Sequence, residues 1–73
     1  MIGNNIRKIR KQKKLTQEKL ARLSNISLNT LTKIESGFAK APNIKTIVKI
    51  SKALGVSVDR LVENYLKNEK SLE

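Results

Sequence analysis

Apolar residues recur in this chain at helical spacing, and each run is short because a capping or turn residue interrupts it. Ile2, Ile6 and Ile9 follow one another at intervals of four and three residues. No stretch alternates polar and apolar residues for long enough to indicate a β-strand. The pattern predicts helices over 4–14, 17–24, 28–36 and 44–54, and a fifth from 58 onward. The expected fold class is therefore all-α, with five short helices.

Residues that favour helix ends stand at the predicted boundaries. Four residues whose side chains accept hydrogen bonds precede helices: Thr16, Ser27, Asn43 and Ser57. Three residues that tolerate a left-handed backbone follow helices: Asn25, Gly37 and Gly55. The loop over 38–42 is expected to place Phe38 as a cap on the core. Ile44 is expected on the inner side of the fourth helix.

Composition excludes several classes of function. Among the 73 residues there is no Cys and no His, and there is one Tyr and one Phe. Without Cys the chain has no disulfide and no thiolate metal site, and without His it lacks the commonest metal ligand and proton shuttle. So few aromatic residues also argue against a small-molecule pocket. We therefore expect neither an enzyme nor a bound metal or cofactor.

The charge of the chain is large and unevenly distributed. Its formal net charge is +10. Residues 1–52 carry thirteen Lys and Arg against two acids, a net +11, whereas 53–73 carry three against four, a net −1. This balance predicts an acidic partner, either nucleic acid or an anionic membrane surface. No apolar run could span a bilayer, and residues 1–5 lack the apolar region of a secretion signal, so a cytoplasmic protein is expected.

The most informative stretch runs from Gln17 to Ser36. Two short helices joined by three residues must cross at a steep angle, and Ala21 supplies the small side chain that a close crossing needs. Four apolar residues are expected beneath this corner: Leu20, Ile26, Leu31 and Ile34. The opposite face of the helix over 28–36 would then present six residues to solvent: Ser27, Leu28, Asn29, Thr30, Thr32 and Lys33.

These exposed side chains suit the edges of DNA bases. The major groove admits an α-helix, and there Asn29 can bond bidentately to adenine, Leu28 can contact a thymine methyl, and Lys33 can donate to guanine or to a phosphate. The alternative is an ordinary solvated helix surface. Leu28 argues against it, because an apolar residue on the outer face of a basic helix has no core to enter.

Three strings carry a family resemblance: IRKIRKQKKLTQEKLA, SNISLNTLTKIESG and IVKISKALGVSVDRL. With them the chain resembles the helix-turn-helix domain of phage repressors and Cro proteins, the xenobiotic-response-element family. The resemblance implies a compact five-helix domain like that of lambda repressor, extending over residues 1–66, with the helix-turn-helix motif at about 17–36. Residues 67–73 would form a tail, either frayed or an extension of the last helix.

The resemblance also implies residue roles. Gln17 matches a residue that bonds a phosphate and braces the recognition helix, and three more match positions that contact the DNA backbone: Thr16, Ser36 and Lys40. Five match recognition-helix positions that face bases or flanking phosphates: Ser27, Leu28, Asn29, Thr30 and Lys33. Arg10 and Glu35 match a buried ion pair. The chain departs from the pattern at Phe38 and Ala41, where many relatives are basic, which weakens the case for phosphate contacts in that loop.

The sequence thus predicts a sequence-specific regulator of transcription that binds double-stranded DNA, most simply as a repressor in a bacterial, archaeal or phage setting. Useful specificity needs two copies, and the fifth helix has the lowest charge, so we expect a homodimer through Tyr65 and Leu66. Val58, Leu61 and Val62 are assigned instead to the core of the monomer. An antitoxin with a separate toxin partner is a second possibility.

Three rival classes remain to be separated. A membrane-surface protein would need one continuous apolar helix face, whereas these stripes are short and interrupted. A structural RNA binder would need exposed aromatic residues for stacking, and Tyr65 is the one candidate. A protein-interaction module with this fold would show no salt-sensitive binding to DNA.

Overall fold

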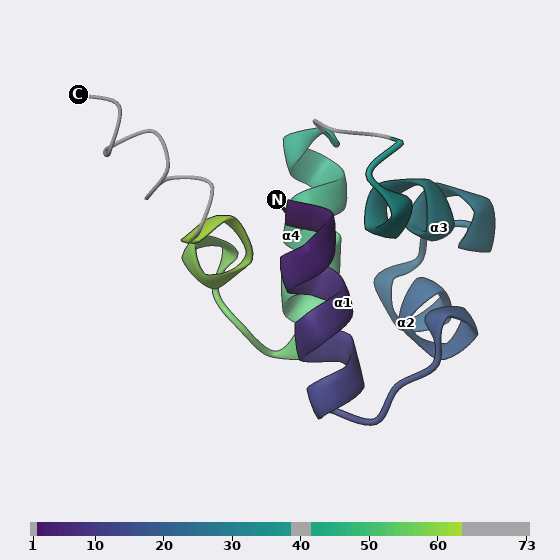
Figure 1. Ribbon diagram of the computed structural model, residues 1–73, viewed down its shortest axis with the longest axis horizontal. Helices are drawn as coiled ribbons and strands as arrows, with labels where there is room; N and C mark the ends of the chain where they lie inside the picture. The colour runs from purple at the N-terminus through teal and green to yellow at the C-terminus, as the bar shows by residue number, and fades with distance from the viewer. Residues whose placement is uncertain (1, 39–41, 64–73) are drawn as a thin grey trace.

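The computed structural model describes residues 2–38 and 42–63. These form four complete helices: α1 (Ile2–Gln12), α2 (Gln17–Ser24), α3 (Leu28–Ser36) and α4 (Ile44–Leu54). A fifth helical segment covers 58–63, up to the end of the described residues (Figure 1). No strand occurs among the described residues. The expected all-α class is confirmed.

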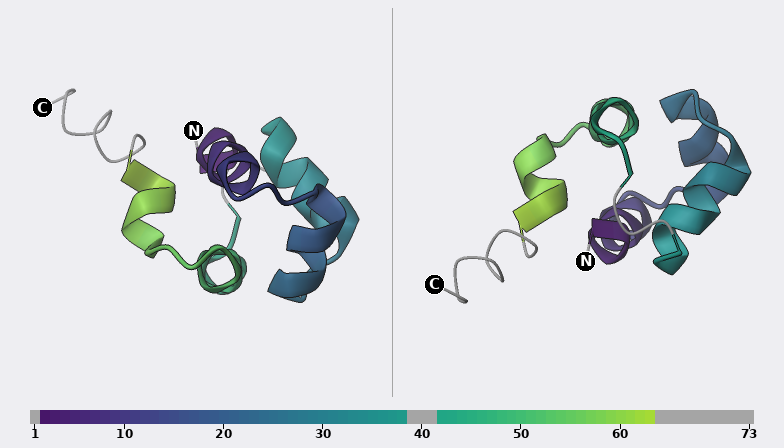
Figure 2. Two further views of the ribbon diagram at one scale, coloured as in Figure 1. Left: turned by 90° about the horizontal axis from the view of Figure 1, so that it is seen from below. Right: turned by 90° about the horizontal axis from the view of Figure 1, so that it is seen from above.

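The four helices surround one core. α1 packs against α3 and α4, and α2 packs against the same two helices on the other side. Both views of Figure 2 show the result: α1, α3, α2 and α4 follow one another around a square, so that α3 and α4 stand at opposite corners. None of the helices in the described stretches is long and apolar enough to cross a bilayer.

Capping residues set most helix boundaries as predicted. The side chains of Thr16, Ser27 and Asn43 accept the backbone N–H three residues on, at 3.0, 3.0 and 2.9 Å. Ser57 does the same for the segment over 58–63, at 3.2 Å. Three residues end α2, α3 and α4 in the left-handed conformation: Asn25 (φ 57°), Gly37 (φ 85°) and Gly55 (φ 71°).

α1 is the exception, because it begins and ends two residues earlier than the range 4–14 expected from sequence. Lys14 has φ 59°, which a helix cannot include. Its N–H donates to Lys11, and the N–H of Leu15 donates back to Arg10, at 3.0 and 3.1 Å. This is the hydrogen-bond pattern of a left-handed helix end, here without the glycine or asparagine that would have signalled it.

The core draws on every described helix. Its seven fully buried side chains are Ile6, Leu20, Leu31, Ile34, Ile50, Leu54 and Leu61. Ile26, Val58 and Val62 are half-buried against them. The assignment of Val58, Leu61 and Val62 to the core of the monomer is therefore confirmed. Tyr65 and Leu66 lie outside the described residues.

Two expected core positions are wrong. Burial along the inner side of α4 falls from Ile50 (0% exposed) through Ile47 (9%) to Ile44 (63%), so the core ends before the first residue of this helix. Phe38 is 79% exposed and does not cap the core. The left-handed Gly37 turns the chain off the end of α3, and the ring of Phe38 lies instead beside the ammonium of Lys33.

Candidate nucleic-acid interface

The corner between α2 and α3 is tight and is closed by backbone hydrogen bonds. Asn25 donates its N–H to the carbonyl of Arg22 at 3.1 Å, and Ile26 donates to that of Ala21 at 3.0 Å. Ala21 is buried where the helices meet, as expected from its small side chain. Because this turn holds α3 by one face, its other face is left on the outside of the molecule.

The outward face of α3 carries the residues that sequence reasoning placed there. Leu31, Ile34 and Glu35 are buried on the inner side. Thr32 is half-buried, and the other five expected residues are exposed: Ser27, Leu28, Asn29, Thr30 and Lys33. Leu28 is 41% exposed although it is a large apolar residue, so it lies on the surface without a place in the core.

The polar groups on this face differ in how free they are. The hydroxyl of Thr32 donates to the carbonyl of Asn29 at 2.9 Å, and that of Ser36 donates to Lys33 at 3.1 Å. Ser27 donates its hydroxyl to Thr30 at 2.8 Å. The carboxamide of Asn29, by contrast, has no hydrogen-bond partner among the described residues. Its donor and its acceptor are both available to a ligand.

An open groove of about 840 Å³ runs between α1, the start of α2 and the outward side of α3. It brings together five of the expected contact residues, which are Thr16, Gln17, Leu28, Thr32 and Ser36. Arg7 lines the same groove, and it was not identified from the sequence as a contact residue. Its position could have been inferred, because it precedes Arg10 by three residues and so lies on the same side of α1. Lys40 lies outside the described residues.

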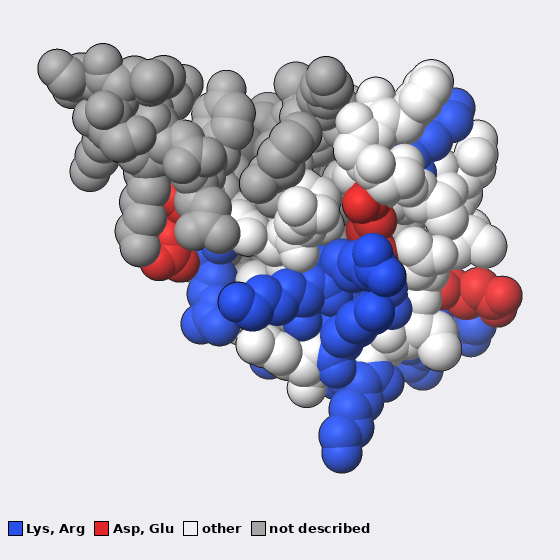
Figure 3. All heavy atoms as spheres, viewed as in Figure 1, with Lys and Arg blue, Asp and Glu red and all other residues white. Residues whose placement is uncertain are grey.

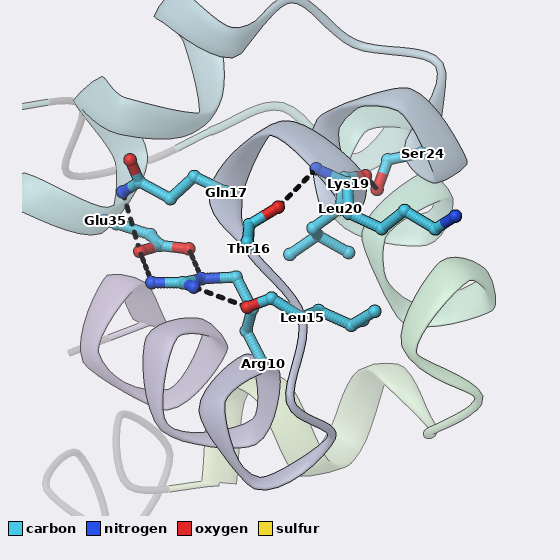
Figure 4. A network of polar contacts seen from close by, with 8 residues as sticks. All are labelled: Arg10, Leu15, Thr16, Gln17, Lys19, Leu20, Ser24 and Glu35. Atoms are coloured by element: carbon cyan, nitrogen blue, oxygen red, sulfur yellow. Dashed lines mark hydrogen bonds and ion pairs between the residues drawn. The ribbon is translucent and has the colours of Figure 1, made fainter.

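A buried polar network forms the floor of this groove (Figure 4). Arg10 donates from Nε to Glu35 Oε2 at 2.8 Å and from Nη2 to Oε1 at 3.0 Å, which is a bidentate ion pair. Its Nη1 donates to the carbonyl of Leu15 at 2.7 Å, and Gln17 Nε2 donates to Glu35 Oε1 at 3.0 Å. The network therefore ties α1, the segment before α2, and α2 itself to the end of α3.

Two more contacts that hold the groove together were not foreseen. A β-carbon on Gly3 would overlap the carbonyl oxygen of Ile34, so α1 approaches the backbone of α3 as closely as only glycine allows. Asn5, which is 9% exposed, donates to the carbonyl of Leu61 at 2.8 Å and so joins α1 to the last described segment. Neither residue belongs to an apolar pattern, so neither drew attention in the sequence.

Positive charge lies beside the groove, whose own lining contains two bases, Arg7 and Arg10, and two acids, Glu18 and Glu35. Figure 3 shows Lys and Arg side chains gathered over α1, next to the largely uncharged surface of α3. The exposed bases of α1 are Arg7, Lys8 and Lys11, and Lys13 and Lys14 follow directly. The charge of Glu35 is balanced by Arg10 beneath them. The face as a whole is therefore suited to an extended polyanion.

Comparisons with known proteins agree with this geometry. The profile of the family described as Helix-turn-helix matches residues 6–61. The chain is 41% identical over 70 residues to YqaE, an uncharacterized HTH-type transcriptional regulator of Bacillus subtilis (strain 168), covering 96% of this chain and 59% of that protein. It is 36% identical over 72 residues to the immunity repressor protein of Bacillus phage phi105, covering 96% of this chain and 49% of the repressor.

A third relative is closer to this chain in length. It is y4dJ, an uncharacterized HTH-type transcriptional regulator of Sinorhizobium fredii (strain NBRC 101917 / NGR234), 36% identical over 62 residues that cover 85% of this chain and 79% of that protein. Of the first two relatives the chain spans only about half to three fifths. The family profile covers the corner between α2 and α3, the Arg10–Glu35 network and most of the core. The chain therefore belongs to the helix-turn-helix family, as its resemblance to phage repressors indicates.

Proposed function

We propose that this protein binds double-stranded DNA at specific sequences and regulates transcription, with α3 in the major groove. One observation carries the proposal: α3 presents Leu28, Asn29 and Lys33 to the outside of a strongly basic protein, while a buried network fixes its position. An α-helix of this kind fits the major groove, and base edges there are distinguished by hydrogen-bond donors, acceptors and the thymine methyl.

The exposed residues divide into two roles. Asn29 bonds an adenine, Leu28 packs on a thymine methyl, and Lys33 donates to a guanine or to a phosphate. The remaining contacts set the register of the protein on the DNA backbone. They come from the hydroxyls of Ser27, Thr30, Thr32 and Ser36, from Thr16 and Gln17 at the N-terminus of α2, and from the bases Arg7 and Lys40. Gln17 has one amide proton in the bond to Glu35 and a second available for a phosphate.

The regulator acts as a homodimer and as a repressor. One helix reads only a few base pairs, and symmetric dimers of this class read half-sites about 34 Å apart. The dimer contact is assigned to Tyr65 and Leu66, in the part of the chain with the lowest charge. The name of the phage relative, an immunity repressor, favours repression. Because its target is DNA, the protein acts in the cytoplasm of a bacterial or archaeal cell. The alternative to a homodimer is an antitoxin that binds a separate toxin.

Selection of bound duplexes from a random pool tests the proposal directly. A DNA-reading protein yields a recurring half-site and its spacing. Binding to that duplex should weaken as salt rises, with a slope of log K against log salt of about −0.9 for each neutralised phosphate. A protein-interaction module would enrich no sequence and show no salt-sensitive shift in a gel, and that result would overturn the assignment.

Replacing Asn29 with alanine is expected to relax base choice at one position of the selected site. The loss should be about 1–3 kcal/mol on the preferred duplex, because the carboxamide makes a bidentate contact with one base. Competition between the preferred duplex and its variants at each position measures the effect. Thr46→Ala is the control, because it lies on α4, which packs against α1 and α2. An equal loss on every sequence would show that Asn29 does not read a base.

Replacing Phe38 with leucine is expected to weaken DNA binding by about two- to fivefold without changing the melting temperature. The ammonium of Lys33 lies 5.9 Å from the centre of the Phe38 ring, a cation–π geometry worth about 0.5–1 kcal/mol at an exposed site. Leucine removes the ring face, so Lys33 loses this restraint, whereas Phe38→Tyr keeps it. Titration of the selected duplex measures the effect, and equal affinity of the leucine variant and the unchanged protein would contradict it.

A further inference from the structure

The outer face of α4 carries a row of positive charge that the proposed DNA contact does not use. We call it the lysine row, and it consists of Lys45, Lys49 and Lys52, all exposed. Spacings of four and three residues place them along one side of the helix, over about 10.5 Å from first to last. The buried residues of α4 lie on the opposite side: Ile47, Ile50, Ser51 and Leu54.

The lysine row points away from the DNA-reading face. α4 packs against α1 and α2, and these two helices separate it from α3 at the opposite corner of the square (Figure 2). The inner side of α4 faces the core, so its outer side faces away from α3. A duplex seated on α3 and in the groove beside it therefore does not reach the lysine row.

In the free protein the row is unfavourable. Like charges three and four residues apart on a helix repel one another. Lys45 is also the second residue of α4, where the helix dipole disfavours a cation. α4 contains no acidic residue, and none of the three ammoniums has an ion pair or hydrogen bond within the described part of the chain. A partner that supplies closely spaced negative charge would relieve both penalties.

We propose that the lysine row binds the phosphate backbone of a second DNA duplex while α3 reads a first. The inference rests on the proposed function, which supplies the first duplex. Lysine is depleted in protein interfaces, where aromatic residues and arginine act as anchors, and the row contains neither. A duplex carries one negative charge per ~1.7 Å of its axis and needs no anchor of that kind. A protein with two such faces joins two DNA segments, or passes from one to the other without being released.

A bridging assay tests the inference. The duplex selected for α3 is immobilised and saturated with protein, and a fluorescent duplex of unrelated sequence is then added at salt between about 50 and 200 mM. The triple variant Lys45→Gln, Lys49→Gln, Lys52→Gln removes the charge and keeps good helix propensity. The matched triple variant with arginine keeps the charge. Thermal melts of both verify that α4 is folded.

The glutamine variant is expected to bind the first duplex with unchanged affinity and salt slope. Its capture of the second duplex should fall at least tenfold, and the salt slope of that step should fall by about 2.7, which is 0.9 for each of three phosphates. The arginine variant should capture the second duplex normally.

Three results would overturn the inference. The first is undiminished capture of the second duplex by the glutamine variant, and the second is an equal loss of binding to both duplexes. The third comes from replacing the second duplex with phosphatidylglycerol vesicles: the lysine row would capture the vesicles and not the duplex. Undiminished capture would show that bridging runs through the protein dimer. A protein that bound neither duplex would refute the proposed function itself, which is a different outcome.

Discussion

Replacing Arg10 with methionine is expected to lower the free energy of unfolding by about 3–5 kcal/mol, because it leaves a carboxylate buried without its counter-charge. The side chain of Glu35 is 2% exposed. Without the guanidinium it keeps only the bond from Gln17, and the carbonyl of Leu15 loses its donor. A chain of 73 residues has a total stability of about 4–11 kcal/mol, so this loss removes a large part of it.

Thermal and urea unfolding measure the effect, and the melting temperature should fall by about 12–40 °C. Arg7→Met is the matched control, since Arg7 is exposed one turn earlier on the same helix and should change stability by less than about 0.5 kcal/mol. A double variant with methionine at both Arg10 and Glu35 should recover most of the loss, because no charge is left buried. If the Arg10→Met variant melts at the same temperature as the unchanged protein, apolar packing alone holds α3 in place.

The helices of the corner were predictable from sequence because their boundaries depend on local residues. Thr16, Ser27 and Asn25 act on backbone groups within a few residues, and the structure has α2 and α3 over the expected ranges. The end of α1 was predicted two residues too late because Lys14 follows the helix in a left-handed conformation, which its residue type does not indicate. A helix end determined by a backbone hydrogen-bond pattern alone leaves no mark in the sequence.

The outward face of α3 was also predictable, for a reason of geometry. Once Leu31 and Ile34 are assigned to the core, helical periodicity turns Asn29 and Lys33 to the other side. Phe38 and Ile44 were misplaced because their burial depends on where the neighbouring helices end, which periodicity within one segment does not reveal. Hydrophobicity predicts that a residue prefers the core, whereas packing between segments decides whether the core reaches it.

Gly3 was overlooked for the same reason, since its role depends on a contact with a residue 31 positions away. Two helices that meet at a glycine can bring their backbones into contact. Here Gly3 of α1 lies against the carbonyl of Ile34 in α3, and this carbonyl also accepts the N–H of Gly37 at 3.2 Å. The same carbonyl therefore takes part in the C-terminal cap of α3 and in the contact between α3 and α1. A side chain inserted at this point would disturb both at once.

Replacing Gly3 with alanine is accordingly expected to destabilise the protein by about 1–2 kcal/mol net, although alanine favours helix over glycine by about 1 kcal/mol. If α1 shifts as a body, the cost is that of an overpacked interior, about 1–3 kcal/mol and sometimes more. If the first turn of α1 unwinds instead, Ile2 leaves the core, at about 1.5–3 kcal/mol. Neither route avoids a loss.

The size of the substituent and the position of the control make this prediction specific. Gly3→Val should cost more than Gly3→Ala, whereas Asn4→Ala, at an exposed neighbour, should change stability by less than about 0.5 kcal/mol. Urea unfolding measures all three. An alanine variant as stable as the unchanged protein would mean that α1 does not rest on α3 in solution. The groove between them, and with it the alignment of Arg7 with the outward face of α3, would then have to be placed differently.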